Sequence, residues 1–165
     1  MHARHASLAL ALTFAYAATL GLPAYAATAA APEHAHAAHA AAPGKLTLDH
    51  GKRWATDAPL RAGMDRIRAL VAPKVGAIHG GKLAAAEYQA LGVAVEKEVA
   101  DIVAQCKLAP EADAMLHLIV AELLAGADAM QGKGTGSAAS GAHKVVVAAN
   151  DYGRYFDHPG WKPIG

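Results

Sequence analysis

The sequence has a single cysteine, almost no net charge and none of the common catalytic signatures. Cys106 on its own excludes an internal disulfide framework, so stability has to come from packing. A formal net charge of +1 and the lack of a basic patch argue against a nucleic-acid partner. His-Glu-x-x-His, Gly-x-Ser-x-Gly and the glycine fingerprint of cofactor-binding folds are all absent. We therefore expect a protein that is not an enzyme.

The first 26 residues have the features of an export signal. A short basic start precedes an apolar run from Ala6 to Leu22, and Ala24-Tyr25-Ala26 has the small-x-small form of a signal peptidase site. The run is short for a membrane anchor, and no later segment has the length and apolarity to span a bilayer. We expect a signal peptide over 1–26, export to the bacterial periplasm, and no membrane association after cleavage.

Residues 27–44 consist almost entirely of alanine, proline and histidine. They contain no large apolar side chain, so burial cannot offset the entropy of ordering them, and we expect a disordered Ala/His-rich arm. Within six residues this arm carries His34, His36 and His39. Three neutral imidazoles on a flexible segment can converge on one Cu(II), Zn(II) or Ni(II) ion, to which Glu33 can add an oxygen ligand. The alternative is a low-complexity linker whose histidines serve no selected purpose.

Residues 45–165 carry the apolar periodicity of amphipathic helices. In the first of these helices Leu60, Met64, Ile67 and Val71 recur at steps of four, three and four, with Thr56 or Asp57 as candidate caps. Similar spacings predict helices over about 57–79 (kinked at Pro73), 83–108, 110–130 and 142–156. A glycine-rich loop is expected over 132–141. Because the connections are mostly short, we expect an all-α, antiparallel up-down-up-down four-helix bundle.

Two short stretches resemble the soluble cytochrome b four-helix bundles of the bacterial periplasm, which are related to the cytochrome c-prime bundles. They are Leu60-Arg-Ala-Gly-Met64-Asp-Arg-Ile67 and Asn150-Asp-Tyr152-Gly153-Arg-Tyr155. In that family a methionine near the start of the first helix is an axial haem ligand, and Met64 stands at the matching place. The family's ligand histidine directly follows a tyrosine, where this chain has Gly153, and the Cys-x-x-Cys-His motif of cytochrome c-prime is absent. The resemblance implies haem binding or electron transfer, while the simpler interpretation of Met64 is an adaptable core residue.

The end of the chain is rich in polar and aromatic side chains. The candidate binding surface consists of Asn150, Tyr152, Arg154, His158 and Trp161. These residues form either a surface for a ligand or partner, near the segment around Trp54, or a hydrogen-bonded cluster that closes the bundle.

Three functional hypotheses follow from the sequence. The first is a non-enzymatic periplasmic bundle that binds or buffers transition-metal ions, copper above all, through its histidine-rich arm. The second is a haem-binding or electron-transfer protein of the cytochrome b bundle type, and the third is a structural or interaction module with no ligand. In each case we expect a monomer or a weak homodimer. Other histidines, among them His79 and His117, are interpreted as structural, and Cys106 as a small buried apolar residue.

Overall fold

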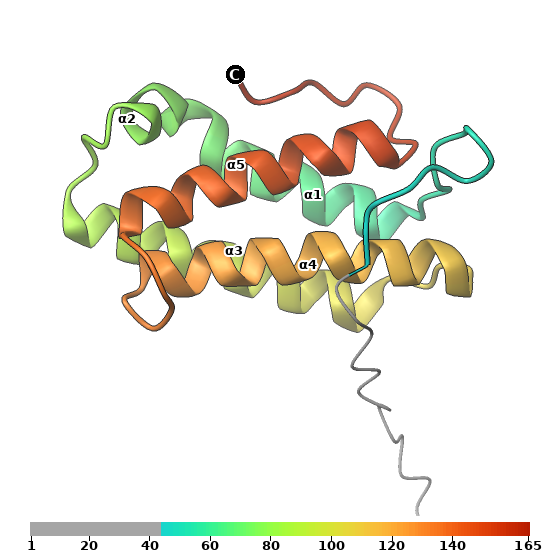
Figure 1. The fold of residues 1–165 in the computed structure, drawn as a ribbon, viewed down its shortest axis with the longest axis horizontal. Coiled ribbons are helices and arrows are strands. Elements are labelled where there is room, and N and C mark those ends of the chain that lie inside the picture. The colour runs from blue at the N-terminus through green and yellow to red at the C-terminus, as the bar shows by residue number, and fades with distance from the viewer. Residues whose placement is uncertain (1–43) are drawn as a thin grey trace, which may run out of the picture. The chain divides into compact units, whose positions relative to one another are not determined.

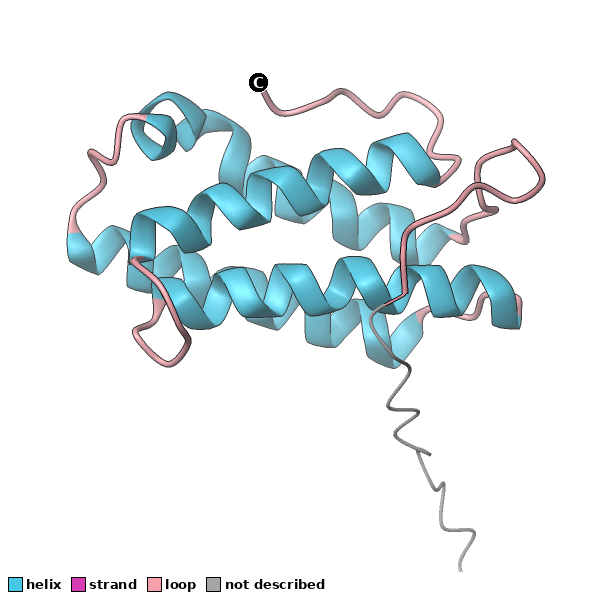
Figure 2. Ribbon diagram, viewed as in Figure 1, coloured by secondary structure: helices cyan, strands magenta, loops and turns pink. Residues whose placement is uncertain are grey.

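Helices are the only regular secondary structure in residues 44–165, the part of the chain that the computed structural model describes (Figures 1 and 2). The four long helices are α1 (Ala58–Val71), α3 (Ala85–Gln105), α4 (Pro110–Met130) and α5 (Ala138–Tyr155). A 3-10 turn, η1 (Ala72–Lys74), and a short helix, α2 (Val75–His79), lie between α1 and α3. The expected all-α fold is therefore confirmed. The predicted signal peptide, and the arm up to residue 43, lie outside the described residues.

Helix α1 begins at a cap that has a second partner elsewhere in the chain. The backbone N–H of Leu60 donates to Oδ1 of Asp57 at 2.9 Å, so Asp57 rather than Thr56 caps the helix. The other carboxylate oxygen of Asp57 accepts from the backbone N–H of Lys107 at 2.6 Å, in the link between α3 and α4. Pro59 lies in the first turn, where a missing N–H is tolerated. The Asp57 side chain thus caps α1 and also attaches it to the loop between α3 and α4.

The expected interruption at Pro73 takes the form of the 3-10 turn η1. Helix α2 follows directly and ends before Gly80 and Gly81, and Gly81 has a φ of +62°, which favours glycine. No helix among the described residues has the length and apolar character needed to cross a membrane.

Two helix ends differ from their predicted positions. Helix α3 ends at Gln105, before the predicted end at 108, and Cys106 adopts an extended backbone. Cys106 is therefore only partly buried, and not the small buried residue that the sequence predicted. Burial, with a further contribution from the Asp57 carboxylate, raises the pKa of its thiol. Helix α5 begins at Ala138, four residues before the predicted start at 142, because the Ser137 side chain accepts from the Ser140 N–H at 3.1 Å.

The core lies between the four long helices and is built mainly from aliphatic side chains. The whole predicted stripe of α1, which is Leu60, Met64, Ile67 and Val71, is fully buried. Helices α4 and α5 pack closely because Gly126 and Gly141 face one another, and a Cβ at Gly141 would lie 2.6 Å from the Gly126 carbonyl oxygen. Tyr152 and Phe156 are the largest fully buried side chains, and they lie at the end of α5 where the candidate site forms.

Candidate functional site

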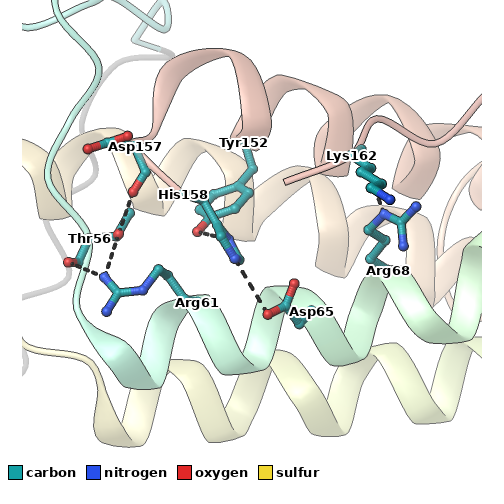
Figure 3. A network of polar contacts seen from close by, with 8 residues as sticks. All are labelled: Thr56, Arg61, Asp65, Arg68, Tyr152, Asp157, His158 and Lys162. Atoms are coloured by element: carbon teal, nitrogen blue, oxygen red, sulfur yellow. Dashed lines mark hydrogen bonds and ion pairs between the residues drawn. The ribbon is translucent and has the colours of Figure 1, made fainter. Parts of the chain in front are cut away.

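The candidate site lies where the segment before α1, the start of α1 and the residues after α5 meet (Figure 3). The backbone N–H of Trp54 donates to the Tyr155 carbonyl at 2.9 Å, and the Asp157 N–H donates to the Trp54 carbonyl at 2.8 Å. Next to this backbone pairing, the Thr56 hydroxyl donates to the Asp157 carbonyl at 2.6 Å. Arg61, one turn into α1, donates to the carbonyl and hydroxyl oxygens of Thr56 at 2.7 and 2.9 Å. These bonds join the segment before α1 to the residues at the end of α5.

A buried histidine connects the core to the surface beside this pairing. His158 has a side chain only 5% exposed, and its Nδ1 lies 3.0 Å from the Tyr152 hydroxyl. Its Nε2 lies 3.5 Å from Oδ2 of Asp65, a side chain that is 60% exposed. An ionised carboxylate only accepts, so we assign the ring proton to Nε2, with Nδ1 accepting from the tyrosine hydroxyl. The contacts of His158 with Tyr152 and with Asp65 therefore form a polar path from the core to the solvent.

Aromatic packing fixes the position of this histidine. The ring of Tyr152 stacks on Phe156, with centroids 5.4 Å apart, and meets the edge of Trp161 at 5.1 Å. Trp161 also lies 5.2 Å from the His158 ring. The indole occupies the space directly over Gly153, where any Cβ would overlap it. Burial raises the pKa of the Tyr152 hydroxyl far above its ordinary value, so this group stays neutral over the physiological range.

The last residues of the chain are fastened along α5 and α1 by side-chain bonds to their backbone. The Asn150 amide donates to the Ile164 carbonyl and accepts from the Ile164 N–H, both at 2.7 Å. The Arg68 Nε donates to the Lys162 carbonyl at 2.7 Å. Ile164 is buried as a result. The terminal segment is therefore an integral part of the fold.

An open pocket of about 500 Å³ lies outside this network. Its lining combines two carboxylates, a guanidinium and an imidazole, and it consists of Ala55, Thr56, Arg61, Asp65, Asp157, His158 and Pro159. The Tyr152 hydroxyl lies behind His158 and is not part of the lining. The pocket therefore offers both signs of charge to a small polar group, and only His158 connects it with the core.

The structure brings most of the predicted binding surface together and adds residues that the sequence did not indicate. Tyr152, His158 and Trp161 contact one another, and Asn150 binds the segment that follows them. Arg154 is exposed and pairs instead with Asp151 at 3.0 Å. The residues missed are Thr56, Arg61, Asp65 and Arg68. Of these, Arg61, Asp65 and Arg68 recur at steps of four and three on α1, which is the one signal that could have pointed to a shared face.

The residues named in the haem prediction lie in closely packed surroundings. Met64 is fully buried within the aliphatic core, and the indole of Trp161 fills the space beside Gly153, where the cytochrome b family has its histidine. His158 is engaged with Tyr152 and Asp65, so it is not free to replace that histidine.

The histidines proposed to bind metal, His34, His36 and His39, lie outside the described residues. Within residues 44–165, no group of three or more His, Cys, Asp or Glu side chains is arranged to hold a metal ion. His117 on α4 has its Nδ1 3.3 Å from Oδ2 of Asp113, which is the one-turn pairing expected from their spacing.

No known protein family, curated protein or solved structure matches the chain. The resemblance to the cytochrome b bundles thus rests on the two short stretches of sequence alone.

Proposed function

We propose that this protein is a non-enzymatic periplasmic protein that binds or buffers transition-metal ions, copper above all, through His34, His36 and His39. The observation that carries the proposal is the spacing of three imidazoles within six residues, in a segment whose other side chains are mostly alanine. Neutral imidazole is a favoured ligand of Cu(II), and affinity among the first-row divalent metals peaks at copper. The apolar run of residues 6–22, followed by Ala24-Tyr25-Ala26, supports export and loss of the first 26 residues.

We further propose that the four long helices form an antiparallel up-down-up-down bundle that carries the histidine-rich arm. Helices α3 and α4 are joined by residues 106–109, and α4 and α5 by 131–137, and connections this short favour antiparallel neighbours. The bond from Lys107 to Asp57 and the pairing of Trp54 with Tyr155 also support this topology. They join the start of α1 to the α3–α4 link and to the end of α5, as an antiparallel bundle requires.

Titration with Cu(II) tests the metal-binding proposal. The secreted protein is compared with a variant in which His34, His36 and His39 are all replaced by alanine, by isothermal titration calorimetry in a non-coordinating buffer. The triple variant should lose the tightest site, and binding to the unaltered protein should weaken as the pH falls below about 6.5, because imidazole must be neutral to bind. A His50→Ala variant is the matched control, since His50 is an exposed histidine next to Asp49. Equal affinity in the triple variant and the unaltered protein would refute the proposal.

The network around His158 favours a second candidate, a structural or interaction module without a metal. Its hydrogen bonds join the first and last described segments of the chain, and its aromatic rings fill the end of the core. A protein purified from its own host with no bound metal, and with no copper affinity above that of the triple variant, would support this candidate over the first.

A further inference from the structure

Two histidines from separate helices meet on the surface away from the site described above. His79 is the last residue of α2, and its ring lies against that of His143 on α5, with centroids 5.6 Å apart and planes at 63°. Both side chains are exposed. They line an open pocket of about 640 Å³ with Ile78, Gly80, Gly81, Ala139 and Ser140. Since α2 packs on α5, the pair is held together by the fold rather than by closeness in sequence.

The pair differs from the other histidines of residues 44–165 in having no polar side-chain partner. The others are held as follows: His50 lies beside Asp49, His117 beside Asp113, and His158 between Tyr152 and Asp65. Within the described residues, the ring nitrogens of His79 and His143 take part in no hydrogen bond or ion pair. Four ring nitrogens on two exposed side chains therefore remain available to an added ligand.

We propose that His79 and His143 form a two-histidine site for a divalent transition-metal ion, with Cu(II) bound most tightly. Imidazole nitrogen is a borderline ligand that suits copper, nickel and zinc, and affinity for an N-donor site peaks at Cu(II). Two rings already in contact need only rotate about exposed side-chain bonds to direct one nitrogen each at a common ion. Water completes the coordination, because no third His, Cys, Asp or Glu of the described residues joins the pair.

Metal at this site would join α2 to α5. Helix α2 has only five residues, it follows the 3-10 turn at Pro73, and it is anchored in the core by one buried side chain, Ile78. An ion bridging His79 and His143 adds a link that exists only in the folded chain, so it stabilises the native state by mass action. This site does not include the histidine-rich arm, so its test is independent of the test of the proposed function.

The test uses the secreted protein with His34, His36 and His39 replaced by alanine, which removes the ligands of the arm. Into this background we introduce His79→Ala, His143→Ala or both, with His117→Ala as the matched control on an exposed histidine. CuCl₂ is titrated by calorimetry, and electron paramagnetic resonance counts the nitrogens bound to the metal. The background should bind one Cu(II) through two nitrogens, and either single replacement should weaken this binding by about tenfold or more. The background melting temperature should rise with copper, and that rise should disappear in the double variant.

Three results would overturn the site: no copper binding by the background, equal affinity in the background and the double variant, or a loss produced as strongly by His117→Ala. Both residues are exposed, so the metal-free variants should keep the helical circular dichroism and melting temperature of the background. The proposal that the arm binds metal is tested separately, by comparing the copper affinity of the unaltered protein with that of the background. A failure of either site therefore leaves the other measurable.

Discussion

At the scale of single residues, the end of α5 depends on Tyr152 and Gly153, two positions whose surroundings leave little room for change. The Tyr152 hydroxyl is the partner of a ring nitrogen on the buried His158, and Gly153 provides the space that the Trp161 indole fills. A buried polar atom without a partner has a cost comparable to a lost hydrogen bond, and an added atom in a packed core has a steric cost. Each position therefore yields a mutational prediction.

Tyr152→Phe should destabilise the protein by about 1–3 kcal/mol, because it leaves Nδ1 of the buried His158 without its partner. The change keeps the aromatic packing against Phe156 and Trp161, so the loss reports on the hydroxyl. Urea denaturation followed by circular dichroism measures it. Tyr155→Phe is the matched control, since that hydroxyl makes no hydrogen bond with any residue of 44–165, and it should change stability by less than about 0.5 kcal/mol. Equal effects from both changes would contradict the role assigned to the Tyr152–His158 bond.

Gly153→Ala should cost about 1–3 kcal/mol, because its methyl group overlaps the indole of Trp161 and the terminal segment has to shift. Gly76→Ala offers the opposite case within α2, where a Cβ meets no atom within 4 Å. That change should stabilise by roughly 0.5–1 kcal/mol through reduced backbone freedom in the unfolded chain. The pair is compared by chemical denaturation. A Gly153→Ala protein as stable as the unaltered one would show that Trp161 is not held where the structure has it.

At the scale of elements, the ends of helices depend on caps that also connect one element with another. Asp57 caps α1 through one oxygen and binds the α3–α4 link through the other. Ser137 caps α5 through a bond within the same turn and has no such second role in the described residues.

Asp57→Ala should therefore destabilise more than Ser137→Ala. Loss of a cap alone costs about 0.5–2 kcal/mol, and Asp57→Ala also leaves the Lys107 N–H without its acceptor. Asp57→Ser keeps a capping oxygen but is too short to serve both partners, so it should fall between the unaltered protein and Asp57→Ala. The stabilities of the variants are compared from their denaturant midpoints, provided that the m-value is the same in each variant. If Ser137→Ala cost as much as Asp57→Ala, the bond to Lys107 would contribute nothing to stability.

The positions of the helices could be predicted from apolar spacing, but their exact ends and the candidate site could be predicted only in part. The stripe from Leu60 to Val71 is buried as its spacing indicates, because a helical period places those side chains on one face. Helix α5 starts earlier in the sequence than predicted, because Ser137 caps it within a segment whose glycine-rich composition predicted a loop. The contact of Asp65 with His158 could not be predicted from the sequence, because it depends on how α1 is aligned with the residues after α5.

At the scale of the whole molecule, the Tyr152 hydroxyl couples the stability of the fold to alkaline pH. Burial raises its pKa in the folded protein above the value of about 10 that it has in an unfolded chain. The folded state therefore favours the protonated form more strongly than the unfolded state does. The stability that this difference contributes is fully present below about pH 10 and is lost as the pH rises further, because only the unfolded chain releases the proton readily.

The free energy of unfolding should accordingly fall between about pH 10 and 12, and this fall should be smaller in Tyr152→Phe. Urea unfolding at a series of pH values measures both proteins, and the difference between their curves isolates the hydroxyl from the lysines that titrate over the same range. Tyr155→Phe serves as the control, because Tyr155 is only partly buried. Should the curves of Tyr152→Phe and the unaltered protein stay parallel up to pH 12, the buried hydroxyl would not govern alkaline unfolding. Such a result would mean that the Tyr152 hydroxyl ionises as readily in the folded protein as in the unfolded chain, contrary to its burial.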